Sequence, residues 1–201
     1  MQAVHAIEYQ GRGGKTIIAP AAMALLRDSP CVHCGQCAAH CPVGAIYETP
    51  PKMDMWAKLS DPDTISVVQI APSVRVALGE EFGLKPGDLT TGKIYTALRR
   101  IGFEYVFDSN FSADLTIAEE AQEFVTNFTD RTYTFPQFTS CCPAWVEFAE
   151  KYHHDLIPHL SSTKSPMQIM GAMIKTYWAE KMSIDPKKIF SVAVMPCTAK
   201  K

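Results

Sequence analysis

The 201-residue sequence lacks several features that would assign it to common classes of protein. Its net charge of −2 gives no electrostatic reason to expect a nucleic-acid partner. Its longest apolar runs, such as Ile65–Ile70 and Phe190–Pro196, are too short to cross a bilayer. Residues 1–25 contain no basic segment followed by a long apolar core, and no twin-arginine pair. With 47% hydrophobic residues the chain is not disordered. We therefore expect a cytoplasmic, folded protein that neither inserts into a membrane nor binds nucleic acid.

Cysteine is the residue that stands out. The chain has seven cysteines, an odd number, and no export signal, which together argue against a framework of disulfides. They are Cys31, Cys34, Cys37, Cys41, Cys141, Cys142 and Cys197. Four of them lie within eleven residues, and reduced thiols clustered in this way are typical of metal ligands.

The first four cysteines follow the spacing C-x2-C-x2-C-x3-C-P, which ends at Pro42. Short steps let successive thiolates wrap one face of a cubane, and Gly35 permits the tight turn between them. The spacing predicts a [4Fe–4S] cluster on Cys31, Cys34, Cys37 and Cys41. A zinc site is the alternative, but zinc sites usually pair two separated C-x2-C knuckles. In two-cluster ferredoxins the fourth cysteine serves the other cluster, so Cys41 either completes this cluster or binds a second one.

Beyond residue 60, short apolar runs alternate with longer stretches of helical spacing. The expected strands are Ile65–Ile70, Glu104–Asp108, Phe135–Thr139 and Ile189–Met195, the third being the weakest because Pro136 lies near its start. The expected helices are Thr91–Ile101, Leu115–Phe128, Ala144–Tyr152 and Ser165–Met182. The alternation predicts an α/β fold with a parallel four-stranded sheet flanked by helices.

A smaller module is expected ahead of the sheet. The glycine-bearing stretch Tyr9–Lys15 suggests a short hairpin or a loop, and Pro50-Pro51 interrupts the chain after the cysteine run. We therefore divide the chain into a ferredoxin-like α+β module at residues 1–58 and a lobe containing the sheet at residues 59–201.

The remaining three cysteines fall where a ligand is expected. In open α/β sheets, ligands bind outside the carboxyl ends of the strands. The segments just past those ends include Thr139–Pro143, with Cys141 and Cys142, and Met195–Cys197. Adjacent side chains that leave a strand-to-helix turn diverge, so one ligand and one free thiol is the simpler division of the pair. The alternative is two inert cysteines buried in a core.

Two of these segments resemble known signature loops. Thr139-Ser-Cys-Cys-Pro-Ala-Trp145 and Met195-Pro-Cys-Thr-Ala-Lys-Lys201 are similar to two of the three signature loops of [FeFe] hydrogenases. The cysteine run, Ala71-Pro72-Ser73 and Thr91–Leu98 also resemble that family. The resemblance covers nearly the whole chain from about residue 10. It implies that residues 59–201 form one lobe of the hydrogenase catalytic domain.

The resemblance also implies ligands for the catalytic H-cluster, which is a [4Fe–4S] cluster joined to a diiron subcluster with CO and CN ligands. Cys142 and Cys197 match ligands of its cubane, and Cys141 matches the proton donor and acceptor that faces the diiron unit. The residues that match the surroundings of that unit are Ala71, Pro72, Ser73, Met195 and Lys200. Ser73 and Lys200 would hydrogen-bond its cyanide ligands, where a buried ammonium offsets negative charge.

Three residues match the family's proton relay, which leads outward from Cys141. They are Glu120, Ser161 and Glu123, and the two carboxylates are three apart, hence on one face of a helix. Two departures affect the site. Asn127 stands where an arginine often lies at the mouth of the relay, and Ala144 replaces a common glycine.

The activity implied by the resemblance is the reversible oxidation of H2 to protons and electrons. Electrons would pass through the [4Fe–4S] cluster of the first module to the H-cluster, and the redox partner would be a ferredoxin or an NAD(P)-linked subunit. The third signature loop is missing, so we expect an incomplete piece, inactive alone, that needs the remainder of the catalytic domain. Two alternatives remain: a non-catalytic hydrogenase-like iron–sulfur protein for cluster assembly or sensing, and a simple electron carrier.

Overall fold

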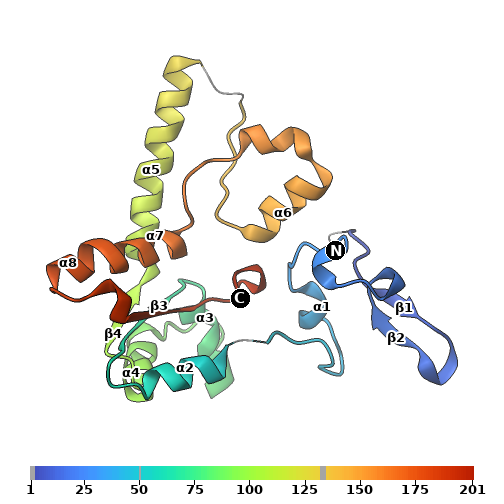
Figure 1. Ribbon diagram of the computed structural model, residues 1–201, viewed down its shortest axis with the longest axis horizontal. Coiled ribbons are helices and arrows are strands. Elements are labelled where there is room, and N and C mark those ends of the chain that lie inside the picture. The colour runs from blue at the N-terminus through green and yellow to red at the C-terminus, as the bar shows by residue number, and fades with distance from the viewer. Residues whose placement is uncertain (1–2, 50, 132–134) are drawn as a thin grey trace.

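A parallel sheet lies at the centre of the larger part of the computed structural model, which describes residues 3–49, 51–131 and 135–201 (Figure 1). Its strands are β3 (Ile65–Ile70), β4 (Tyr105–Asp108) and β5 (Ile189–Val194), in the order β4-β3-β5. Both pairings are parallel, and Val68 lies opposite Val106 on one side and Val192 on the other. The predicted α/β fold with a parallel sheet is confirmed.

The expected fourth strand is wrong. Phe135–Thr139 contributes one isolated bridge, between Phe138 and Leu160, and the sheet formed by the described residues has three strands. Pro136 has no N–H with which to join a ladder. Phe138 instead exchanges two 2.7 Å backbone hydrogen bonds with the segment around Leu160, donating to the carbonyl of His159 and accepting from the N–H of Ser161.

Helices cover both faces of the sheet, because successive side chains of β3 point to opposite faces. On one face, α7 (Pro166–Met173) and α8 (Ala179–Lys181) lie in a rod joined by a π-helical stretch, Ile174–Trp178. Val67 packs there with Met170, Ile174 and Ala179. On the other face lies α4 (Thr91–Ile101), where Val68 and Ile70 pack with Ile94, Leu98 and Phe103.

The helix predictions hold, with differences at the ends. Helix α4 has the predicted bounds, whereas α5 (Ser109–Asp130) begins six residues before the expected Leu115. The carboxylate of Asp108 caps α5 by accepting from the N–H of Asn110 at 2.9 Å, which favours this earlier start. In α7, Ser165 and Gln168 form a reciprocal capping box.

The remaining helices connect these elements. They are α2 (Lys52–Leu59), α3 (Val74–Ala77) and α6 (Pro143–Tyr152), with short 3-10 turns at Leu78–Phe82, His154–His159 and Thr198–Lys200. Helix α6 matches the predicted Ala144–Tyr152 to within one residue. Among the described residues, no helix is both long enough and apolar enough to cross a membrane.

The N-terminal part is a small arrangement of strands and turns. Strands β1 (Glu8–Gln10) and β2 (Ile17–Ala19) form an antiparallel hairpin, the first of the two expected alternatives, and α1 (Gln36–Ala39) lies within the cysteine run. Figure 1 shows α1 beside the C-terminal end of the chain and near α6. Pro50 lies outside the described residues, and the division of the chain near residue 58 stays a prediction.

Candidate iron–sulfur and catalytic site

Cys142 and Cys197 lie on the wall of one cavity. Cys142 is the N-cap of α6, and Cys197 follows β5, so the start of a helix and the end of a strand bring the two residues to one cavity. The cavity has a volume of about 590 Å³. Cys34 of the cysteine run lines it too, together with Val32, Trp145 and Phe148. Three thiols from distant parts of the sequence therefore share one partly apolar space.

Cys141 lies on the wall of a different cavity, of about 450 Å³. Lys200 lines that cavity, as do Glu150, Met167 and Gln168. The adjacent thiols of Cys141 and Cys142 thus face different surroundings. Cys141 shares its cavity with charged residues, Lys200 and Glu150 among them, and Cys142 shares its cavity with Cys34 and Cys197.

The other residues matched to the diiron surroundings lie close to the ends of β3 and β5. Ala71 is buried, and its N–H donates to the carbonyl of Val194 at 3.0 Å, which joins the two segments. Pro72 and Ser73 are exposed and precede α3, while Met195 is half-buried directly after β5. The sheet therefore brings the Ala71–Ser73 and Met195–Cys197 segments together.

Backbone N–H groups surround the sulfurs of the cysteine run. The N–H of His33 donates to Cys31 Sγ at 3.3 Å, and that of Ala45 donates to Cys41 Sγ at 3.2 Å. Burial raises the pKa of the Cys31 thiol, with the His33 N–H acting in the opposite direction. Several backbone N–H groups, those of Ile46 and Val43 first, lower the pKa of the Cys41 thiol. N–H donors of this kind stabilise thiolate, the form that binds iron.

Within the described ranges, no three Cys, His, Asp or Glu side chains converge as they would around a single metal ion. A cubane differs from a single ion, because each of its thiolates binds a different iron at a different corner. The four cysteines, two of which accept N–H hydrogen bonds at sulfur, therefore fit an iron–sulfur cluster.

Glu120, Ser161 and Glu123 form a connected polar group. The buried Ser161 hydroxyl donates a short hydrogen bond to Glu123, whose other oxygen accepts from the N–H and the hydroxyl of Ser162 at 2.9 and 2.7 Å. Burial tends to raise the pKa of Glu123, but the donors from residues 161–163 outweigh burial and lower it. Burial and the charge of Glu123 raise the pKa of Glu120. The carboxyl of Glu120 thus holds a proton more readily than the carboxyl of Glu123.

This group is tied to the cysteine pair through Ser140. The Ser140 hydroxyl donates to the Ser161 carbonyl at 2.7 Å, and Ser140 directly precedes Cys141. At the outer end, Gln137 donates to Glu123 Oε2 at 3.1 Å and accepts from Asn127 at 3.5 Å. Gln137 was not expected from the sequence, since nothing in its local pattern indicates a contact with a carboxylate on α5.

The cysteine run is docked onto α6 by polar contacts that the sequence analysis also missed. Glu147 accepts from His33 Nδ1 at 2.8 Å and pairs with Lys151 at 2.8 Å. The Lys151 ammonium donates to the carbonyls of Ser29 at 3.1 Å and Cys31 at 2.5 Å. Burial tends to raise the pKa of Glu147, but hydrogen bonds from His33 and Lys151 outweigh burial and lower it. A further ion pair joins Lys201 and Glu48.

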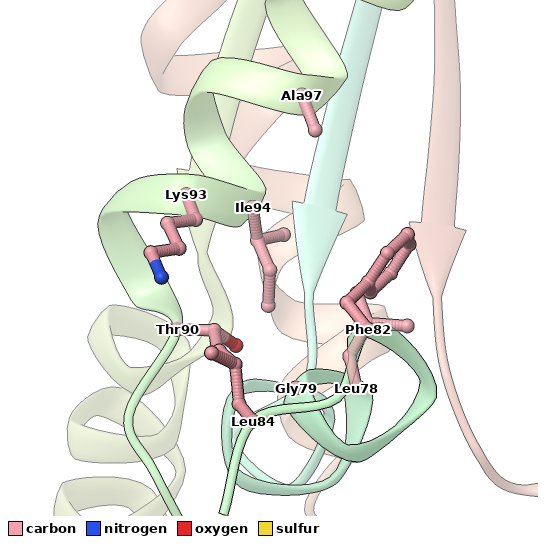
Figure 2. Close-up of a pocket in the computed structure, with 8 residues that line it drawn as sticks. All are labelled: Leu78, Gly79, Phe82, Leu84, Thr90, Lys93, Ile94 and Ala97. Carbon is pink, nitrogen blue, oxygen red and sulfur yellow. The ribbon is translucent and has the colours of Figure 1, made fainter.

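A third cavity lies apart from the cysteines, between α4 and the turn Leu78–Phe82 (Figure 2). Its volume is about 350 Å³. It is lined by Leu78, Gly79, Phe82, Leu84, Thr90, Lys93, Ile94 and Ala97. None of these eight side chains is a cysteine, a histidine or an acid, so this cavity offers neither metal ligands nor an acid–base pair.

Comparison with known families agrees with this geometry. Residues 64–201 match the pattern described as "Iron only hydrogenase large subunit, C-terminal domain". Residues 28–47, which contain the cysteine run, match the "4Fe-4S binding domain".

Individual proteins are similar over most of the chain. The "NADP-reducing hydrogenase subunit HndD" of Solidesulfovibrio fructosivorans is 46% identical over 94% of this chain and 33% of that protein. The "Cytosolic iron-sulfur assembly component 3" of Bos taurus is 37% identical over 70% of this chain and 30% of that protein. A variant of apo [FeFe]-hydrogenase HydA1 from Chlamydomonas reinhardtii superimposes with a TM-score of 0.69 at 45% identity, over 74% of this chain and 38% of that one.

The chain spans about a third of the length of these curated relatives. Its match to the hydrogenase pattern nevertheless covers the whole sheet, α6 and all three C-terminal cysteines. The cysteine run matches an iron–sulfur binding motif in its own right. The chain belongs to the iron-only hydrogenase large-subunit family.

Proposed function

We propose that this chain supplies part of the catalytic site of an [FeFe] hydrogenase, which interconverts H2 with protons and electrons. One observation carries the proposal: Cys142 shares a cavity with Cys197, while its neighbour Cys141 shares another with Lys200. This arrangement separates thiols that would hold a cluster from a thiol free to move protons. It supports the division of roles that the family resemblance implies.

The H-cluster would supply the chemistry that splits and forms H2. Cys142 and Cys197 would hold its [4Fe–4S] part. Lys200 would orient the diiron part through charge-assisted hydrogen bonds to cyanide, together with Ser73. Ala71, Pro72 and Met195 would be the other residues that surround the diiron part. Trp145 and Phe148 line the cavity beside Cys142 and would give the cluster apolar surroundings.

Protons would leave the site through Cys141, Glu120, Ser161 and Glu123. Cys141 would accept a proton at Sγ and pass it toward Glu120, the carboxyl with the raised pKa. The Ser161 hydroxyl would connect Glu120 to Glu123, which is held ionised by its donors and therefore able to accept. Asn127 and Gln137 would stand at the outer end in place of a charged group.

Electrons would pass through a [4Fe–4S] cluster on Cys31, Cys34, Cys37 and Cys41, held by a ferredoxin-like module at residues 1–58. The lobe at residues 59–201 would need the remainder of the catalytic domain. The redox partner would be a ferredoxin or an NAD(P)-linked subunit, and the name of the NADP-reducing relative supports the second. We place the protein in the cytoplasm.

A second candidate function is cluster assembly without catalysis, which the 37% identity to the iron–sulfur assembly component favours. An assembly protein needs cysteine ligands but has no use for a proton path. The connected group of Glu120, Ser161 and Glu123, tied to Ser140, favours the enzyme.

The test is reconstitution of the full-length protein with iron, sulfide and a synthetic diiron cofactor, followed by measurement of H2 turnover. Cys141→Ser should lower turnover roughly a hundredfold or more while keeping the iron content, because a positioned proton carrier contributes about that much. Cys142→Ser, the matched change one residue away, should instead lose cubane iron. Loaded clusters without any turnover would favour the assembly function. Loss of iron in Cys141→Ser rather than Cys142→Ser would reverse the assigned roles.

A further inference from the structure

The backbone of the cysteine run is held against α6 by three side chains of the last turns of that helix. Lys151 bonds to the carbonyls of Ser29 and Cys31, and Glu147 bonds to the His33 ring. The Tyr152 hydroxyl donates to the Pro30 carbonyl at 2.8 Å. Every one of these bonds involves the few residues around Cys31, while the other end of the same helix begins at Cys142. Helix α6 therefore bridges the cysteine run and the cavity that contains Cys142 and Cys197.

A second contact joins the cysteine run to the Cys197 segment. The Thr198 hydroxyl donates to the His33 carbonyl at 2.8 Å. The Thr198 side chain also lies directly against Gly35, where an added Cβ would lie 2.5 Å from Thr198 Cγ2. Gly35 has a φ of +75°, a conformation that glycine adopts without strain. The two segments thus approach more closely than any other residue at position 35 would allow.

These contacts create a short path between two proposed cluster ligands. Cys34 adjoins His33, the His33 carbonyl accepts from Thr198, and Thr198 adjoins Cys197. One hydrogen bond therefore connects a cysteine of the run to a cysteine of the catalytic cavity. Both cysteines line the same cavity wall.

We propose that Thr198 and Lys151 are positioning residues for electron transfer between the two cluster sites, fixing the Cys34 segment against the Cys197 segment. This inference rests on the proposed function. One electron leaves a reduced cluster at the cysteine run, which is thereby oxidised, and reduces the cluster at Cys142 and Cys197. No covalent bond forms or breaks, and the electron comes from the redox partner.

The test uses the full-length protein loaded with iron–sulfur clusters but without the diiron unit, so that it does not depend on H2 turnover. The protein is mixed with limiting dithionite, and rapid-freeze EPR measures the rate at which the electron moves from one cluster to the other. Thr198→Val keeps the methyl packing on Gly35 and removes the hydroxyl. It should slow the transfer roughly tenfold, because small displacements of reacting centres are costly.

Three controls separate positioning from folding. Thr176→Val removes a hydroxyl that also donates to a carbonyl at 2.8 Å, on a distant helix, and should leave the rate unchanged. Thr198→Ser keeps the hydroxyl and should restore the rate. Lys151→Met should slow the transfer, whereas Lys175→Met should not, although Lys175 also donates to two carbonyls, at 3.0 and 2.6 Å.

Transfer at the wild-type rate in Thr198→Val with both EPR signals present would overturn this inference and leave the proposed function standing. Equal slowing in Lys151→Met and Lys175→Met would also overturn it, because the effect would then be a general loss of rigidity. A wild-type protein that shows only one cluster signal would instead reject the proposed function, and this inference with it.

Discussion

The sheet and the cysteine run are held in place by different forces. In the sheet, Val67, Val68 and Ile70 have no exposed surface and pack against helices on both faces. Among the described residues of the segment 26–49, Val32 is the one buried apolar side chain, at 2% exposure. The cysteine run is positioned instead by polar contacts to Lys151, Glu147 and Thr198.

The forces that stabilise the sheet therefore differ from those that position the cysteine run. Apolar burial contributes most of the free energy of folding and is non-directional, so the sheet resists unfolding. Hydrogen bonds contribute modestly, about 0.5–1.5 kcal/mol each, but they fix direction and distance. A change in the core should therefore unfold the protein, and a change in the docking contacts should move the cysteine run while the sheet stays folded.

The largest effect is expected in the core. Ile174→Ala removes a side chain that is 1% exposed and leaves a cavity beside Val67, which should lower the free energy of unfolding by about 3 kcal/mol. Ile101→Ala, at a helical position that is 43% exposed, should lower the free energy of unfolding by less than about 1 kcal/mol. Urea unfolding followed by circular dichroism measures both. Equal costs would mean that the core does not carry the stability assigned to it.

An intermediate effect is expected at the approach of the cysteine run to Thr198. Gly35→Ala adds a Cβ 2.5 Å from Thr198 in a left-handed backbone conformation. It should weaken the docking of the cysteine run by about 1–3 kcal/mol. Gly44→Ala is the matched control, since its φ is +62° but nothing lies within 4 Å of the added Cβ. Gly35→Ala should speed proteolysis within segment 26–49 more than Gly44→Ala, with little change in the urea midpoint of the sheet. Identical digestion of the two variants would show that the contact with Thr198 is unimportant.

The smallest effect concerns pH. The pKa of Glu147 is lower in the folded protein than in the unfolded chain, so its contribution is fully present above the unfolded pKa and is lost as pH falls through the folded pKa. Glu147→Gln should thus be less stable than wild type by under about 1 kcal/mol at neutral pH. The difference should shrink toward zero in acid, which urea unfolding at several pH values measures. A difference that grows in acid would contradict the assigned sign.

Local patterns predicted the elements well where apolar residues dictate them. The continuous run Ile65–Ile70 is buried on both faces, and Thr91–Ile101 has a regular apolar stripe, so their bounds follow from the sequence. Phe135–Thr139 was misread, because its apolar residues outweighed the missing N–H of Pro136. The early start of α5 was also missed, although Asp108 is a strong capping residue that signals it.

Local patterns also predicted only part of the candidate site. The end of β5 decides the position of Cys197, which topology alone could predict, whereas Cys142 reaches the same cavity at the start of α6, without the expected strand before it. The contacts of Lys151 with Cys31 and of Thr198 with His33 join residues more than a hundred positions apart. Nothing in the local pattern of either partner indicates them, since a lysine on a helix surface is ordinarily solvated.

The divergence of Cys141 and Cys142 has a consequence for how this turn can vary. The two thiols are separated by a single peptide bond, yet one faces Lys200 and the other faces Cys197. Inserting or deleting one residue between Ser140 and Pro143 would displace or remove one of these thiols, so that the two cavities would no longer each keep their own cysteine. The length of this turn is therefore as constrained as its composition.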